Sequence, residues 1–139
     1  MGEKELAELL HLVSRRLRHG YVRRLVPLGL NPGQARALRA LADAEGPLRM
    51  VRLADELRIV PRSLTPVVDA IEEAGLVRRE VDPANRRSTL LVITPEGRVL
   101  SERARDARRQ AGEELFAVLP EDQREQLRGL LSLVDAQFR

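Results

Sequence analysis

Residues 61–96 read PRSLTPVVDAIEEAGLVRREVDPANRRSTLLVITPE. In the first half of this stretch, apolar residues recur every three or four positions, which predicts a helix that begins at Pro61 and ends near Gly75. The period then changes, because two short apolar or β-branched runs, 76–81 and 89–93, enclose a turn-forming segment with paired arginines. The stretch therefore predicts a helix followed by a β-hairpin with a basic tip.

Three further helices are predicted upstream. In the first, about residues 3–26, apolar side chains at spacings of three and four form one face. The second, about 31–46, has an asparagine cap, a proline in its first position and a glutamine three residues after the cap. The third is short and covers about 50–57. Its side chains expected to face inward are Val51, Ala54 and Leu57.

Two helices are predicted downstream of the hairpin. The sequence TPE at 94–96 has the cap, proline and acid of a helix start, and an apolar stripe continues to about Val118. Pro120 opens the last helix. Its side chains expected to face inward are Leu127, Leu130, Leu131, Val134 and Phe138. We therefore expect a mainly α fold with a small β-hairpin, built as a single domain over residues 1–139.

Composition excludes several classes of protein. The 139 residues contain no apolar run of the roughly 18 residues that a membrane span requires, and the first residues lack the basic-then-apolar pattern of an export signal. We therefore expect a cytoplasmic protein with no membrane partner. Cysteine is absent and there are only two histidines, so we expect no disulfide, no metal site and no cofactor. No catalytic motif stands out, and we predict that the chain is not an enzyme.

Arginine supplies nearly all of the positive charge. The net charge is only +3, but the isoelectric point is about 10.4, because Lys4 is the sole lysine. Arginine presents a planar fork of donors that suits phosphate and guanine. Binding to nucleic acid would explain the excess of arginine, but a genome rich in arginine codons explains it equally well. Only the positions of the arginines can decide between these two explanations.

The order of elements points to DNA. Two short helices joined by a tight turn and followed by a basic hairpin are the parts of a winged helix-turn-helix, here about residues 31–94. The major groove of duplex DNA is about 12 Å wide and admits one helix. The first helix of the pair braces the second, and the hairpin, or wing, reaches phosphates or the minor groove. We therefore expect double-stranded DNA as the partner.

The candidate recognition residues lie at the start of the helix that follows Pro61. Its apolar residues are expected to face the core, which leaves Arg62, Ser63, Thr65 and Pro66 exposed. Arg62 would donate two hydrogen bonds to a guanine, while the hydroxyls of Ser63 and Thr65 contact bases or phosphates. The alternative is that these are ordinary surface residues of a first helical turn.

The candidate wing residues are Asp82, Arg86 and Arg87. The paired arginines at the tip are hard to explain by packing, although a merely solvated loop is the alternative. Asp82, at the end of the first wing strand, is expected to order the loop through an ion pair with Arg86.

The outer helices predict a homodimer. The segments at about 3–26 and 95–138 carry apolar stripes that one winged helix cannot cover. Packing against a second copy would bury them and present two recognition helices to a pseudo-palindromic site, with half-sites roughly 34–36 Å apart. A closed six-helix monomer is the alternative.

The sequence resembles the MarR family of bacterial transcriptional regulators over essentially its whole length. The resemblance is strongest in IEEAGLVRR at 71–79, DPANRR at 82–87 and LVITPEG at 91–97. In that family these segments are the end of the recognition helix, the wing, and the start of the long dimerisation helix. The resemblance implies that Arg62, Ser63 and Thr65 lie in the major groove, while one wing arginine enters the minor groove.

Three positions depart from the family pattern. Val60 stands where a capping serine is usual, Pro66 where an arginine is common, and Asn85 where an aspartate is usual. The first two departures support an alternative function, a winged-helix module that contacts proteins and has lost specific DNA binding.

The resemblance also implies an effector. Family members respond to small phenolic or lipophilic anions bound between the dimerisation helices and the DNA-binding lobe, and most of them repress transcription. The candidate effector residues here are His11, Arg15, His19 and Tyr21; the alternative is that they are surface or interface residues. Because cysteine is absent, thiol oxidation is excluded as the signal.

Overall fold

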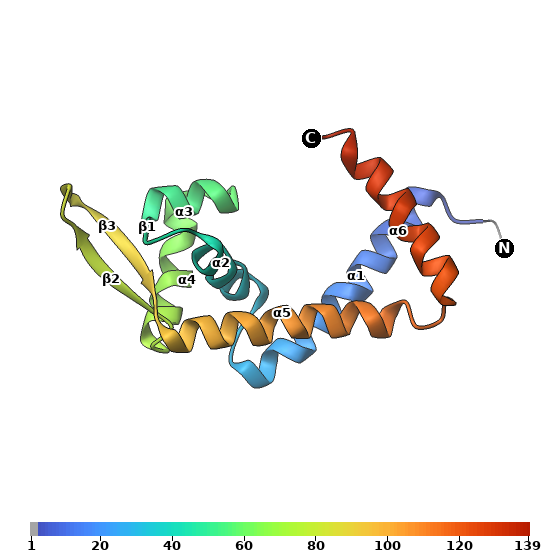
Figure 1. Cartoon of the computed structure of the whole chain (residues 1–139), viewed down its shortest axis with the longest axis horizontal. Coiled ribbons are helices and arrows are strands. Elements are labelled where there is room, and N and C mark those ends of the chain that lie inside the picture. The colour runs from blue at the N-terminus through green and yellow to red at the C-terminus, as the bar shows by residue number, and fades with distance from the viewer. Residues whose placement is uncertain (1–2) are drawn as a thin grey trace.

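A computed structural model describes residues 3–139; Met1 and Gly2, which the predicted domain includes, lie outside the described residues. The fold is mainly α with a small antiparallel sheet, as expected (Figure 1). The elements are α1 (Leu6–Leu25), the short 3₁₀ helix η1 (Val26–Leu28), α2 (Pro32–Asp43), β1 (Leu48–Arg49), α3 (Met50–Leu57), α4 (Pro61–Glu73), β2 (Val77–Asp82), β3 (Asn85–Ile93), α5 (Pro95–Leu115) and α6 (Glu121–Ala136).

The elements separate into two groups along the long axis. Figure 1 shows α2, α3, α4 and the sheet gathered at one end, with α5 running away from them toward α1 and α6. The helix α1 packs across α5, where a Cβ placed on Gly20 would lie 3.6 Å from that of Ala111. The ion pair between Arg24 and Glu114 joins the same two helices.

The sheet contains a strand that the sequence did not predict. Its order is β1-β3-β2, and β1 pairs with β3 through Leu48 opposite Leu91. A strand of two residues carries no readable alternation, so the pattern gave no signal for it. The hairpin turn is also shorter than expected: it holds only residues 83–84, and β3 already begins at Asn85.

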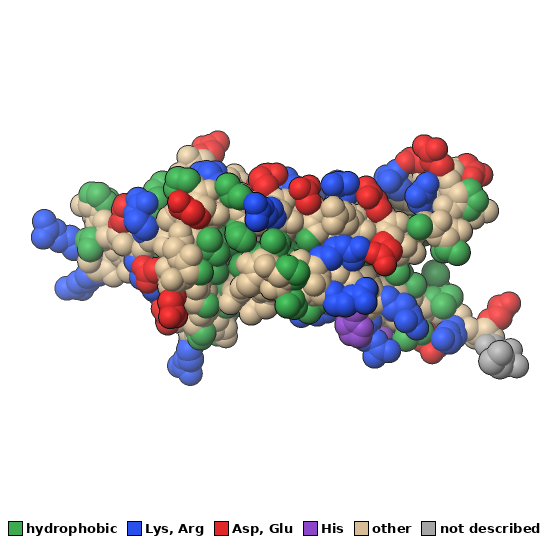
Figure 2. Space-filling model, turned by 90° about the horizontal axis from the view of Figure 1, so that it is seen from below, with side chains coloured by type: hydrophobic (Ala, Val, Ile, Leu, Met, Phe, Trp, Pro, Cys, Tyr) green, Lys and Arg blue, Asp and Glu red, His purple; other side chains and the backbone are tan. Residues whose placement is uncertain are grey.

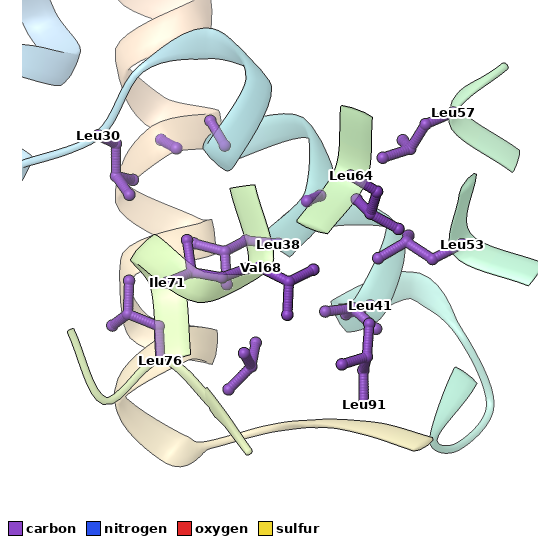
Figure 3. Packing of buried hydrophobic residues seen from close by; sticks show 14 of the residues in the cluster. Leu30, Leu38, Leu41, Leu53, Leu57, Leu64, Val68, Ile71, Leu76 and Leu91 are labelled. Carbon is purple, nitrogen blue, oxygen red and sulfur yellow. The ribbon is translucent and has the colours of Figure 1, made fainter. Parts of the chain in front are cut away.

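One core joins α2, α3 and α4 to the sheet. Figure 3 shows Leu38, Leu53, Leu64 and Leu91 converging from α2, α3, α4 and β3, and all four side chains are fully buried. Val51, predicted to face inward, is instead 68% exposed. A spacing of three falls roughly 60° short of a helical turn, so two such steps from Leu57 rotate Val51 out of the buried face.

Thr94 fastens the start of α5 to the end of α4. Its Oγ1 accepts the N–H of Gly97 at 3.0 Å, which confirms the predicted cap, and donates to the carbonyl of Gly75 at 2.7 Å. Its own N–H donates to the carbonyl of Leu76 at 3.0 Å. Gly75 itself has φ of 79°, a left-handed conformation that glycine adopts without strain. The four residues therefore form one hydrogen-bonded junction.

The outermost helix keeps its apolar side uncovered within the chain. The five residues of this segment that were predicted to face inward are partly or fully exposed, and Phe138 is 80% exposed. Val118 was predicted to continue the stripe of the long helix, but α5 ends at Leu115 and Val118 is exposed in the following turn. The first turn of α1 is similar, since Leu6 is exposed.

The close approach at the Thr94 junction makes Gly97 sensitive to any side chain. A Cβ on Gly97 would lie 2.1 Å from the carbonyl oxygen of Leu76 and 2.8 Å from Cγ1 of Ile93. Because buried backbone must shift to admit it, we expect Gly97→Ala to lower the free energy of unfolding by about 2–3 kcal/mol in urea titrations at fixed protein concentration.

The control for Gly97→Ala is Gly112→Ala in the same helix, where an added Cβ meets no atom within 4 Å. This second substitution should be neutral or raise stability by up to about 1 kcal/mol, because alanine favours helix more than glycine. Equal effects of the two changes would contradict the tight junction.

Candidate nucleic-acid interface

The turn between α3 and α4 is built for a close crossing of two helices. Arg58 ends α3 with φ of 56° and is the only residue other than glycine with positive φ in the described chain, residues 3–139. Arg36 of α2 donates from Nη2 to the carbonyl of Leu57 at 2.7 Å, which holds the end of α3. Ala54, with its small side chain, is 1% exposed at the crossing, as predicted.

The four candidate recognition residues all lie exposed at the start of α4. Leu64, Val68 and Ile71 are buried, so the side chains of residues 62, 63, 65 and 66 are left on the outer surface. The cap residue Val60 makes no side-chain hydrogen bond to the first turn, as its apolar side chain predicts. The N–H of Ser63 donates to the carbonyl of Val60 at 2.9 Å, and Pro61 has no N–H, so the exposed side chains supply most of the polar groups that this turn offers to an external partner.

Arg86 and Arg87 lie on β3 rather than in the hairpin turn. The pairing of β2 with β3 shifts after Val81, which faces Thr89, so that the next pair is Asp82 with Asn85. The two arginines fall in the segment skipped by this shift, and both are exposed. Basic side chains project from the hairpin end of the molecule in Figure 2.

Asp82 braces the wing, but through a different partner from the one predicted. Its Oδ2 accepts from Nε of Arg49 at 2.7 Å, and its Oδ1 accepts from the N–H of Ala84 at 2.9 Å. The predicted ion pair with Arg86 is wrong, because β1 lies beside β3 and brings Arg49 to the carboxylate. The hydrogen bond from Ala84 and the guanidinium of Arg49 hold the pKa of the Asp82 carboxyl below its usual range.

A second cluster, absent from the sequence predictions, ties the recognition helix to the wing. Nη2 of Arg79 on β2 lies 2.6 Å from Oδ1 of Asp69, and its Nη1 bonds to Glu72. The N–H of Arg79 also donates to Glu72 at 3.1 Å. Both carboxylates belong to the second half of α4. This cluster therefore fixes the angle between the helix and the hairpin, and neutralises part of the acidic charge near the candidate DNA surface.

The four effector candidates on α1 are not brought together. His11, Arg15 and His19 follow one another at intervals of four along one side of the helix, and Arg15 and His19 line a small hollow there. Tyr21 turns toward α2 and α5 and lines a cleft of about 480 Å³. The other residues that line this cleft are Ser14, Leu17, Arg18, Pro32, Ala35, Arg36, Arg39, Asp43, Ser101, Ala104, Arg105 and Arg108.

Among residues 3–139 there is no group of three or more histidine and acidic side chains placed to hold a metal ion. Within the same range, no helix is both long enough and apolar enough to cross a membrane.

Comparison with known proteins places these features in a family. A model of the MarR family matches residues 28–88. The HTH-type transcriptional repressor Rv2887 of Mycobacterium tuberculosis is 31% identical over 126 residues, which cover 91% of this chain and 90% of the repressor. The reduced form of MarR from E. coli superposes with a TM-score of 0.86 at 26% identity, over 96% of this chain and 98% of that one.

Two solved structures of Rv2887 are also similar. Its complex with DNA has a TM-score of 0.79 at 28% identity, covering 95% of this chain and 98% of that one. Its complex with p-aminosalicylic acid has a TM-score of 0.75 at 28% identity, covering 95% and 99%.

The lowered pKa of Asp82 predicts how wing order depends on pH. A carboxyl whose pKa is lower in the folded state stabilises that state above its ordinary pKa, about pH 4, and loses this contribution as pH falls through the lower value. We expect Asp82→Asn to reduce hydrogen-exchange protection of the wing amides at pH 6. The difference from the original protein should shrink toward pH 3.

The control is Glu80→Gln, which removes a carboxylate from an exposed pair with Arg78 on the same strand. It should leave the protection of the wing nearly unchanged, since exposed ion pairs contribute little. A difference between Asp82→Asn and the original protein that is independent of pH would show that the carboxylate charge does not order the wing.

Proposed function

This chain belongs to the MarR family, and from that premise we propose that it represses transcription as a homodimer bound to a pseudo-palindromic operator. The observation that carries the proposal is the start of α4, where four side chains able to contact bases are exposed on a helix whose opposite side is core. The solved complex of the relative Rv2887 with DNA supports this assignment.

In the proposed complex, α4 enters the major groove with its first turn. Arg62 donates from its planar guanidinium to O6 and N7 of a guanine, and Ser63 contacts the adjacent backbone or base. Within residues 3–139, no carboxylate lies within 4 Å of Arg62, so its guanidinium forms no ion pair with the described residues. The wing arginines, Arg86 and Arg87, contact phosphates or the minor groove beside it.

The uncovered apolar surface at the far end of the molecule supports the homodimer. Leu130, Leu131 and Val134 on α6 are between 44% and 58% exposed, and Leu9 and Leu10 on α1 are similarly exposed. Large exposed apolar patches mark interaction surfaces, and a two-fold dimer would bury the same patch on both copies. Two copies of α4 would then face half-sites roughly 34–36 Å apart.

The proposal is tested by fluorescence anisotropy on the intergenic DNA upstream of the gene, against a scrambled duplex at near-physiological salt. We expect binding at least 1,000-fold tighter to the specific duplex, on the order seen for specific regulators. A duplex with one half-site destroyed should bind far more weakly than the intact one. Equal, weak and strongly salt-dependent binding to both duplexes would favour the alternative of a protein-interaction module.

Arg62→Ala and Arg87→Ala should each lower the affinity for the specific duplex by about 1–3 kcal/mol. The loss at Arg62 should disappear when its guanine is replaced, whereas a wing arginine that contacts phosphate should weaken binding to all sequences alike. The matched control is Arg103→Ala, an exposed arginine on α5, which should leave affinity unchanged. If both test variants bind like the original protein, α4 and the wing are not the DNA surface.

We further propose that a small aromatic anion binds the cleft lined by Tyr21 and releases the repressor from DNA. Five arginines line this cleft against one acidic residue, Asp43, which pairs with Arg105 at 3.2 Å. The cleft lies between α1 and α5 on one side and α2 of the DNA-binding lobe on the other, so an occupant would shift the population of orientations between them. The solved complex of Rv2887 with p-aminosalicylic acid supports this proposal.

We expect millimolar p-aminosalicylate to weaken operator binding, and Arg39→Gln to reduce this response strongly, because the variant lacks one of the five guanidinium groups that line the cleft and would attract the carboxylate. The measurement is anisotropy with and without the compound. Arg15→Gln is the matched control, because Arg15 lines the separate hollow on α1. Loss of the response in Arg15→Gln but not in Arg39→Gln would move the effector to that hollow.

A further inference from the structure

Pro66 is placed where a proline weakens the helix that holds it. It is the sixth residue of α4 (Pro61–Glu73) and lies inside the helix. Proline has no N–H to donate to the carbonyl four residues earlier, here that of Arg62, so the helix loses one of its hydrogen bonds. Pro66 is also exposed, so its ring adds little to the core. A residue that breaks a local rule without a gain in packing marks a surface used for something else.

The exposed surface around Pro66 is partly apolar. Val60, just before the helix, is 63% exposed, and Pro61 is exposed beside it. Thr65 donates its hydroxyl hydrogen to the carbonyl of Pro61 at 3.3 Å. That hydrogen is therefore engaged inside the helix, and the γ-methyl of Thr65 remains for an apolar contact.

The charge of α4 restricts which part of the helix can approach DNA. Its second half carries Asp69, Glu72 and Glu73, and only the first two of these are paired with Arg79. Phosphates are repelled from that half and attracted to the first turns, where Arg62 lies and the helix dipole is positive. The apolar group at Thr65 and Pro66 therefore belongs to the part of the helix that lies nearest the base edges.

We propose that Pro66 and Thr65 are specificity-determining residues that read the C5-methyl groups of thymines next to the guanine read by Arg62. The inference rests on the proposed function. The C5-methyl of thymine is the only methyl group on the major-groove edges of the four bases, and small apolar side chains are its partners. Four residues of helix span about 6 Å, so the methyl group read by Pro66 lies one or two base pairs from the guanine.

The test removes only the methyl group from the DNA. The tightest duplex selected from a randomised pool is remade with each thymine replaced in turn by uracil, at the same place in both half-sites. We expect one or two positions near the guanine at which this change weakens binding about four-fold for each methyl group removed. Thymines elsewhere in the duplex should tolerate the change.

The protein side of the test uses matched variants. Pro66→Ser removes the ring, and Thr65→Ser removes one methyl group while it keeps the hydroxyl. In each variant the ratio of Kd values for the uracil and thymine duplexes should fall toward one at the position that residue reads. Pro27→Ser, at an exposed proline in η1, should keep the full ratio. The ratio is independent of any general change in affinity or helix stability.

The possible outcomes distinguish a failure of methyl readout from a failure of the proposed DNA-binding function. If the protein selects a duplex but uracil and thymine bind alike at every position, or the ratio survives in both Pro66→Ser and Thr65→Ser, methyl readout is overturned and DNA recognition stands. If no duplex is preferred over a scrambled one, the proposed function itself is overturned. A uracil effect that disappears in the matching variant alone establishes the assignment.

Discussion

Thr94 holds the junction on which the arrangement of the whole molecule depends. Its hydroxyl caps α5 and donates to the end of α4, while its N–H donates to the next carbonyl. Gly97 then lets the first turn of α5 lie directly against Leu76. Because the recognition helix, the sheet and the long helix meet at this point, the direction of α5 is set by the DNA-binding lobe.

The parts of the fold that were predictable are those that depend on residues only a few positions apart in the sequence. The asparagine cap of α2, with Gln34 reaching back to the cap residue, and the Thr94 cap of α5 each depend on residues three apart. The exposed start of α4 follows equally from helical spacing, which buries Leu64 and Val68. Local rules also identified the hairpin, although its turn is shorter because turn-forming residues extend into β3.

The parts that were not predictable depend on residues distant in sequence. Arg49 meets Asp82 across 33 positions, and only the pairing of β1 with β3 brings them together. The ion pairs of Arg79 with two carboxylates of α4 likewise form only because the helix packs against the hairpin at a particular angle, which local sequence does not specify. The cleft beside Tyr21 is assembled from three helices, whereas Arg15 and His19, two of the other effector candidates on α1, line a separate hollow. Patterns in a single helix cannot show which neighbour it packs against.

The uncovered apolar side of α6 has a genetic consequence in the proposed homodimer. A subunit that retains α1, α5 and α6 but carries a defective α4 would still pair with normal subunits, and each mixed pair would present only one working recognition helix. Such alleles should be dominant over the normal gene. Alleles that damage α6 instead release a subunit unable to pair, and they should be recessive. The position of a mutation along the chain thus decides its pattern of inheritance in a merodiploid cell.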